Sequence, residues 1–424
     1  MTTTAAGASR GLRGGAAIAV AMGIMNLATY GYTVVAAHTI GKEAFGAFAA
    51  LMGVLLVVNV LSLGIQATGA RRIAANPTQA ASIEPVVLGV GYRSALALGL
   101  LCLLISPLLW VVLRLDSVLT AMLVAVAVVP LTYMGAQAGV LQGERRWGTL
   151  ANVYLFQGLG RVIFGVALML VWPSEFTALL GVALGAWLPV LVAHVALRRP
   201  RTEESLGDGH PRLDLIREVA HSSQALLAFF ALSNADILLA RAALPHDEAG
   251  LYAGGLIMTK AILFLPQFIV VIAFPSMARG LSRRRLGLVL GTAAAFGMCG
   301  MLGILAFPDL AVTFIGGEEY AGVSDDLWKF AIVGTLLSMI QLLVYSALAR
   351  RQGRALVMIW TTLLMLVVGS FWTTDVSSLV TLVMALDALL CAALLVTAML
   401  ANPASAVDPA MTADLEHTLL HNEG

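Results

Sequence analysis

Residues 44–72 read AFGAFAALMGVLLVVNVLSLGIQATGARR, an apolar run that ends in the arginine pair Arg71 and Arg72. A membrane-spanning helix needs about 20 mostly apolar residues to cross a hydrocarbon core of about 30 Å. This run is long enough, and its only charged residues stand at its end. The stretch therefore predicts a helix that crosses a membrane and places two arginines at one surface.

Runs of this kind recur along all 424 residues. The composition agrees, because 59% of the chain is hydrophobic and 12% is charged, whereas soluble proteins carry about 25% charged residues. We expect an all-α polytopic membrane protein of about 12 transmembrane helices. The expected spans are 15–37, 44–68, 85–113, 117–141, 148–171, 176–197, 219–243, 251–275, 286–307, 325–349, 355–372 and 377–400.

Arginines gather in alternate gaps between these spans. The arginine-rich gaps hold Arg71, Arg72, Arg145, Arg146, Arg198, Arg199, Arg201, Arg279, Arg283, Arg284, Arg285, Arg350, Arg351 and Arg354. The opposite gaps hold only Lys42, Arg114 and, at a span edge, Lys329. By the positive-inside rule the arginine-rich side is the cytoplasm. We therefore expect a multi-pass protein of the plasma (cytoplasmic) membrane with both termini in the cytoplasm.

One long polar gap, 198–218, contains glycine and proline and divides the spans into six and six. We expect an N-terminal six-helix lobe over 1–197, a cytoplasmic linker over 198–218 and a C-terminal six-helix lobe over 219–400. The polar residues 401–424 are expected to form a cytoplasmic tail.

The turn after the first span is repeated after the seventh. GKEAFGAFA at 41–49 aligns without gaps with PHDEAGLYA at 245–253, so that acid, glycine, aromatic and alanine recur in register. A weaker echo relates GERR at 143–146 to RQGR at 351–354. Matching turns at like positions are expected of parallel repeats about an axis along the membrane normal. The two lobes are thus predicted to be pseudo-symmetric.

Four expected spans carry polar residues three or four positions apart, which places each set on one helix face. The sets are Asn26, Tyr30 and Thr33; Asn59, Ser62 and Gln66; Tyr154, Gln157 and Arg161; and Ser338, Gln341 and Tyr345. Such faces avoid lipid, so they either hydrogen-bond to neighbouring helices or line a wet cavity. Because the sets occur in both halves, we favour a shared central cavity. Its candidate substrate-binding residues are Asn26, Tyr30, Asn59, Gln66, Gln157 and Gln341.

A few charges fall inside the apolar runs, where a charge at the bilayer centre costs about 2.5–3.5 kcal/mol. Arg161 lies roughly 20 Å along its span from the inner end, too deep to reach the surface easily. We expect it to face water or an anion. Lys260 lies in mid-span and either forms an ion pair with Asp236 or binds substrate. Arg241 lies nearer the outer surface and either joins these cations or reaches the lipid headgroups.

Asp387 has no obvious partner in its own span, so it is protonated, paired across helices or a coupling site for an ion. Asp236 is the second candidate for coupling. Cys102, Cys299 and Cys391 lie far apart in apolar runs, and we interpret them as buried small hydrophobic residues. The sequence has no phosphate-binding loop and no metal-binding motif, so we expect no catalytic residues, no cofactor and no metal. Nucleic acid is not an expected partner.

Several short motifs in the two halves of the chain are similar to motifs of one family of membrane proteins. They are the acid-x-x-Gly-x-aromatic-Ala turn, the Arg71/Arg72 pair, LQGERR at 141–146 and DILLAR at 236–241. Together they resemble the polysaccharide or oligosaccharide flippases of the multidrug/oligosaccharidyl-lipid/polysaccharide exporter superfamily, over about residues 15–400. The resemblance implies a V-shaped pair of bundles that opens alternately to each face of the membrane.

The resemblance also implies a transporter rather than an enzyme. It would move a polyprenyl-pyrophosphate-linked oligosaccharide from the inner to the outer leaflet for cell-surface polysaccharide biosynthesis, beside a polysaccharide polymerase or ligase. Arg161, Arg241 and Lys260 would neutralise the pyrophosphate, and the lipid tail would stay among the membrane lipids. The lipid II branch typically has fourteen spans, which disfavours lipid II as the substrate.

Two other functions stay open. A cation-coupled multidrug exporter of the same superfamily commonly has a cavity carboxylate in the first span, which has none here, although Asp236 and Asp387 are available instead. A membrane scaffold without transport would keep its polar helix faces packed against one another.

Overall fold

The computed structural model describes residues 3–198, 212–277, 283–349 and 353–400, and every regular element in these residues is helical. Within them, 11 helical segments are long and apolar enough to cross a membrane. One more continuous helix, α10 (His246–Met277), has 32 residues. The prediction of an all-α membrane protein with about 12 spanning helices is confirmed.

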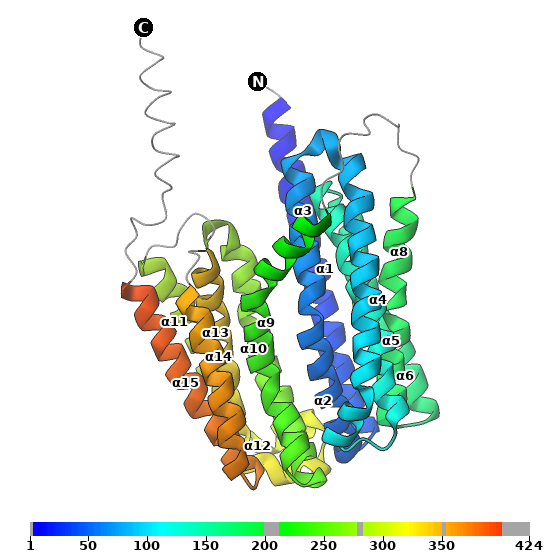
Figure 1. Ribbon diagram of the computed structural model, residues 1–424. Helices are drawn as coiled ribbons and strands as arrows, with labels where there is room; N and C mark the ends of the chain where they lie inside the picture. The colour runs from blue at the N-terminus through cyan, green and yellow to red at the C-terminus, as the bar shows by residue number, and fades with distance from the viewer. Residues whose placement is uncertain (1–2, 199–211, 278–282, 350–352, 401–424) are drawn as a thin grey trace.

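The helices form two bundles that stand side by side (Figure 1). The first bundle contains α1 (Thr3–Thr39), α2 (Lys42–Val58), α3 (Val60–Ala75), α4 (Ala80–Val112), α5 (Val118–Gly143), α6 (Trp147–Val171), α7 (Glu175–Gly185) and α8 (Trp187–Leu197), with the short 3₁₀ turn η1 (Pro77–Gln79). The second contains α9 (Arg212–Ala243), α10, α11 (Arg283–Ala306), α12 (Pro308–Ile315), α13 (Leu327–Ala349), α14 (Gly353–Gly369) and α15 (Val376–Leu400), with η2 (Glu318–Asp326) and η3 (Ser370–Trp372).

The lobe boundaries expected from the sequence, 1–197 and 219–400, stay a prediction. In the expected linker, α9 already begins at Arg212, and residues 199–211 lie outside the described part of the chain. The expected tail, 401–424, also lies outside it.

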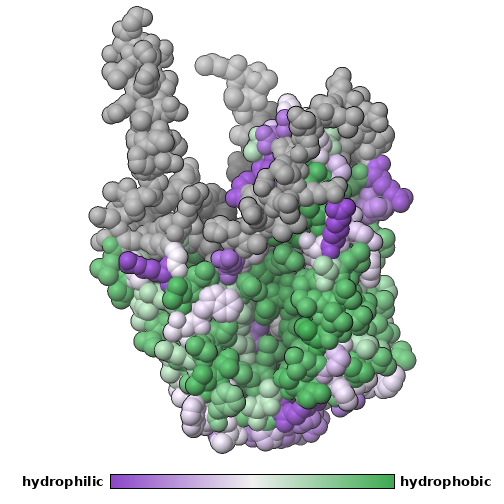
Figure 2. Space-filling model, in the orientation of Figure 1, coloured by the Kyte–Doolittle hydropathy of each residue, from purple (hydrophilic) through white to green (hydrophobic). Residues whose placement is uncertain are grey.

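The two ends of the bundles differ in charge. We call the end that holds the α3–η1 turn and the α5–α6 turn, with Arg71, Arg72, Arg145 and Arg146, the basic end, which is at the top of Figure 1. The opposite end, where α2, α7 and α10 begin, is called the far end. Between the ends the visible surface is mostly hydrophobic (Figure 2), as expected for side chains that face lipid.

Glycines on α5 bring α3 into close contact. A Cβ atom added at Gly139 would lie 2.7 Å from the backbone oxygen of Gln66, and one added at Gly135 would lie 2.5 Å from that of Ser62. Small residues at these positions let two helix backbones approach, which is how membrane helices associate without a hydrophobic driving force between them.

Two expected spans are interrupted in the middle. The second span breaks at Asn59 into α2 and α3, and the sixth breaks at Ala186 into α7 and α8. The second break has a local cause, because the ring of Pro189 conflicts with the carbonyl of Gly185, where α7 ends. The first break has no proline nearby, and both α2 and α3 pack on α5 and on the second bundle.

The second bundle contains an element that the sequence did not predict. Its α11 and α13 are joined through α12 and η2, whereas α4 and α5 of the first bundle are joined by residues 113–117 only. Pro308 starts α12, a position where its missing N–H costs nothing. This insertion reaches the first bundle, since the Tyr320 hydroxyl donates to the backbone oxygen of Ala37 at 3.4 Å.

Candidate functional site

A cavity of about 110 Å³ lies between the bundles where α1, α2, α6 and α10 meet. Most of its wall is apolar, with Phe45 and Phe48 from α2 as the aromatic residues. Its charged lining residues are Arg161 from α6 and Lys260 from α10. The cavity therefore presents two cations, one from each bundle, in an otherwise weakly polar space.

Neither Arg161 nor Lys260 has a hydrogen-bond or ion-pair partner among the described residues. Asp236, the expected alternative partner of Lys260, accepts instead from the Tyr252 hydroxyl at 3.0 Å and from the Ile237 N–H at 2.8 Å. The structure thus does not form the Asp236–Lys260 ion pair. The carboxylate is instead bonded to Tyr252, which is on the same helix as Lys260, and Asp236 and Lys260 interact only at longer range.

Close helix packing fixes the positions of both cations. A Cβ atom at Gly158 of α6 would lie 2.8 Å from the Cα atom of Met25, so α6 presses directly on α1. A Cβ atom at Gly334 of α13 would lie 2.5 Å from the backbone oxygen of Thr259, whose hydroxyl donates to the Phe330 oxygen at 2.9 Å. Arg161 and Lys260 therefore project from rigid helices rather than from loops.

Tyr30 is the third expected residue that lines this cavity. Its hydroxyl donates to the backbone oxygen of Ile257 on α10 at 3.2 Å. Its ring stacks on Phe314 of α12, with the ring centres 6.1 Å apart. Tyr30 thus links the first bundle to two helices of the second bundle at the wall of the cavity.

Five expected polar residues, including Asn59, lie elsewhere than in the cavity wall. Gln66 donates to the Tyr154 hydroxyl at 2.8 Å and to Gln142 at 3.0 Å, inside the first bundle. Gln341 donates to the Tyr345 hydroxyl at 3.3 Å on its own helix. Asn26 and Gln157 also do not line the cavity. These positions fit the alternative of hydrogen bonding within and between helices for Gln66 and Gln341.

Asn59 stands at the break between α2 and α3, and its side-chain oxygen is buried without a hydrogen-bond partner. The residues that the sequence did not single out include Thr29, Met52 and the aromatic pair Phe45 and Phe48. Both phenylalanines belong to the repeated turn at 41–49, and that repeat was the sequence feature that could have identified them as functional residues.

Asp236 and Asp387 lie inside the second bundle and do not line the cavity. Each side chain is 2% exposed, and one oxygen of Asp387 has no hydrogen-bond partner. The two carboxyl groups are close enough to interact electrostatically. A buried carboxyl pair of this kind can exchange a proton or hold a cation.

Arg241 lies at the far end and not in the cavity. Its side chain is 2% exposed, so it does not reach the lipid headgroups either. Its Nε atom donates to the Leu113 oxygen at 2.9 Å, and Nη2 donates to the Arg114 oxygen at 3.0 Å. The sequence suggested neither partner, because both are backbone atoms of the other bundle.

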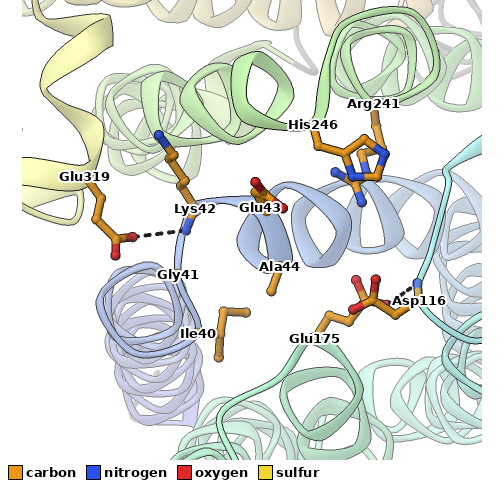
Figure 3. A pocket seen from close by; sticks show the side chains of 10 residues that line it. All are labelled: Ile40, Gly41, Lys42, Glu43, Ala44, Asp116, Glu175, Arg241, His246 and Glu319. Atoms are coloured by element: carbon orange, nitrogen blue, oxygen red, sulfur yellow. Dashed lines mark hydrogen bonds between the residues drawn. The ribbon is translucent and has the colours of Figure 1, made fainter.

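Arg241 also lines a second pocket of about 420 Å³ at the far end (Figure 3). The first bundle contributes the carboxylates of Glu43, Asp116 and Glu175, which face Arg241 and His246 of the second bundle. Partial burial and the guanidinium groups of Arg241 and Arg114 lower the pKa of His246. Among the described residues no group of acidic, histidine or cysteine side chains is arranged to hold a metal ion.

The far end is closed by direct contact between the repeated turns. Gly46 and Gly250, which align in the repeat, touch: a Cβ atom at Gly46 would lie 3.2 Å from the Cα atom of Gly250. A Cβ atom at Gly250 would lie 2.5 Å from the backbone oxygen of Lys42. The Lys42 ammonium also pairs with Asp247 at 2.6 Å. The central cavity is therefore separated from the far end by packed backbone.

A family model described as "Polysaccharide biosynthesis protein" matches residues 12–281, which is more than half of the chain. The curated proteins offer no match. Among solved structures, the fold is similar to an inward-facing multidrug resistance MATE family transporter of the MOP superfamily, with a TM-score of 0.68, 12% identity and coverage of 89% of this chain and 94% of that chain. The outward-facing conformation of such a transporter gives a TM-score of 0.58, 13% identity and coverage of 91% and 94%. The eukaryotic MATE transporter AtDTX14 gives a TM-score of 0.56 and 12% identity, with coverage of 94% of this chain and 97% of that chain.

Proposed function

The chain belongs to the polysaccharide biosynthesis protein family and has the fold of membrane transporters, and on that premise we propose that it is a flippase for a lipid-linked oligosaccharide. It moves a polyprenyl-pyrophosphate-linked oligosaccharide from the inner to the outer leaflet by alternating access. The observation that carries this proposal is the pair of unpartnered cations, Arg161 and Lys260, in the cavity between the bundles.

A pyrophosphate suits this pair better than any cation does. Neither cation is hydrogen-bonded or in direct contact with a carboxylate among the described residues, although Lys260 still feels the charge of Asp236. An anion that binds both cations would supply the close opposite charge that an apolar cavity lacks. Because one charge comes from each bundle, a bound anion also draws the bundles together. Substrate binding thereby favours the movement that closes the cavity on the side from which the substrate entered.

The cavity of about 110 Å³ is smaller than the roughly 300–1,000 Å³ of pockets that enclose a drug-sized ligand. It accommodates the pyrophosphate, while the glycan extends toward the basic end. Outside the cavity wall, we assign Asn26, Asn59 and Gln157 to sugar hydroxyls. Gln66 becomes a further donor if α3 separates from α5 and α6, and Gln341 if its side chain leaves Tyr345. The lipid tail stays in the surrounding membrane.

The positive-inside rule places the basic end in the cytoplasm of a plasma-membrane protein. The closed far end then faces outward, and the cavity loads from the inner leaflet. The membrane potential assists export of an anion from a negative-inside cell by about 2.3 kcal/mol per charge per 100 mV. Asp236 and Asp387 are the candidates for coupling to a proton or cation, and a polymerase or ligase would receive the exported substrate.

Cells depleted of this protein provide the test, with lipid-linked sugars analysed by mass and by a label that reacts in one leaflet only. Accumulation of a polyprenyl-linked oligosaccharide in the inner leaflet is the expected result, and it identifies the sugar. The second candidate, a cation-coupled multidrug exporter, is favoured by the buried carboxyl pair Asp236 and Asp387. Normal lipid-linked sugars together with sensitivity to cationic drugs would establish the exporter instead.

A further inference from the structure

Two helix C-termini from different bundles meet at the far end. Helix α4 of the first bundle ends at Val112, and α9 of the second ends at Ala243. The last carbonyl groups of a helix have no partner within it and carry about half a negative charge in total. Two such ends in one protein interface repel each other unless donors from outside the helices satisfy the carbonyls.

The N–H groups of residues 113–115 bond three of the last α4 carbonyls. Carbonyls at or just past each helix end then receive donors from the other bundle. Arg241, at the end of α9, donates to the Leu113 oxygen at 2.9 Å and to the Arg114 oxygen at 3.0 Å. Arg114, just past the end of α4, donates through Nε to the Arg241 oxygen at 3.1 Å. Its Nη2 atom also donates to the oxygens of Arg241 and Leu244. The two arginines therefore exchange caps across the interface.

The backbone geometry supports this exchange. Arg114 has a φ of 47°, a left-handed conformation that is rare for residues other than glycine. That conformation turns its side chain away from its own helix, so that it reaches the end of α9. Arg241 is 2% exposed, and its charge is compensated by the carbonyls of Leu113 and Arg114, just past α4, and by the carboxylates of the far-end pocket.

We propose that Arg114 and Arg241 form a reciprocal latch that holds the far end closed while the cavity is open to the other side. The two arginines are positioning residues that act on the bundle interface. The hydrogen bonds of each arginine form only while the ends of α4 and α9 lie next to each other. Loss of one guanidinium group therefore also weakens the hydrogen bonds that the other one makes. The latch opens as one unit, which makes closure of the far end all-or-none.

The latch can be tested in the full-length protein with a cysteine in the cavity. Thr33 lines the cavity. Cys102 and Cys391 are buried as expected, but the expectation was wrong for Cys299, which is exposed. Thr33→Cys in a Cys299→Ser background therefore reports the access of a charged, membrane-impermeant thiol reagent added on the far-end side. We expect Arg114→Gln and Arg241→Gln each to raise the labelling rate at least about tenfold, since hydrogen bonds to charged groups are among the strong ones. Arg93→Gln, at an exposed arginine on α4, is the matched control and should change nothing.

The double variant decides whether the caps act together. Arg114→Gln/Arg241→Gln should label no faster than the faster single variant, whereas the product of the two single effects would show two independent contacts and overturn the latch. A cross-linker with two thiol-reactive groups that joins Lys42→Cys to Asp247→Cys should restore the protection of the cavity cysteine in Arg241→Gln. Labelling that persists after this cross-link would mean unfolding rather than opening, and wild-type rates in both single variants would also overturn the proposal. None of these outcomes depends on the substrate.

Discussion

The central cavity and the far-end pocket both contain cations, but only those of the far-end pocket have partners. In the pocket, Arg241 donates to the carbonyls of Leu113 and Arg114, just past α4, and Lys42 pairs with Asp247. In the cavity, Arg161 and Lys260 have no such partner among the described residues. A buried charge with a partner holds a structure together, whereas one without a partner needs a ligand or water. The comparison supports the proposals that the cavity binds the ligand and that contacts at the far-end pocket hold the bundles together.

The largest effect is expected from the cavity cations. Arg161→Ala or Lys260→Ala should lower the flipping rate about 10- to 100-fold, and the double variant should abolish it, because each cation contributes charge-assisted bonds to the anion. Protein abundance in the membrane should not change, since neither side chain holds another residue. The measurement is transfer of the lipid-linked oligosaccharide in vesicles. Arg354→Ala, at an exposed arginine of the basic end, is the control, and full activity of Arg161→Ala would remove the anion site.

The next effect is expected from the glycine contact at the far end. Gly250→Ala places a Cβ atom 2.5 Å from a backbone oxygen, so the turns must separate; Gly46→Ala needs a smaller shift. We expect Gly250→Ala to raise far-end labelling of Thr33→Cys about tenfold and Gly46→Ala to raise it less. Gly148→Ala, where no atom lies within 4 Å of the added Cβ, should behave as wild type. The reverse order of the two glycine variants would contradict this account of the contact.

A smaller effect is expected from His246. Its pKa is lowered when the far end is closed, because burial and the charges of Arg241 and Arg114 outweigh the attraction of Glu43 and Asp116. The imidazole of His246 therefore binds a proton less readily in the closed state than in the open state. Labelling from the far-end side should rise as the outer pH falls through about 6.5. His246→Gln should flatten this response, and an unchanged pH profile in that variant would assign the titration to another group.

The smallest effect is expected from the ion pair between Lys42 and Asp247. Its side chains are 28% and 55% exposed, and exposed pairs of this kind contribute about 0–1 kcal/mol. Lys42→Met should change far-end labelling less than threefold, by roughly 0.6 kcal/mol or less, and the difference should vanish at high salt. A change as large as that of Arg241→Gln would show that this pair, and not the latch, closes the far end.

The membrane spans and the cations within them could be predicted from the sequence, because each depends only on the residues of its own segment. A run of about 20 apolar residues is long enough to cross the membrane by itself. Arginine-rich turns fall in alternate gaps between the spans, whatever the packing of the helices. The depth of Arg161 likewise follows from its place in its helix. The partner of Arg241 could not be read in this way, since backbone carbonyls carry no sequence signal. The α12–η2 insertion was also missed, because its short helix has neither spanning length nor a charge pattern.

The sequence by itself determined the approximate number of membrane spans, the end at which the arginines gather, the repeated turn and the depth of the isolated charges. Only the tertiary structure decided that Arg161 and Lys260 share a cavity, that Asp236 bonds to Tyr252, and that Arg114 and Arg241 exchange caps. The physical reason is that hydrophobic burial in a membrane is a property of each segment alone. The partner of a buried polar group, in contrast, depends on how helices far apart in the chain are rotated and brought together.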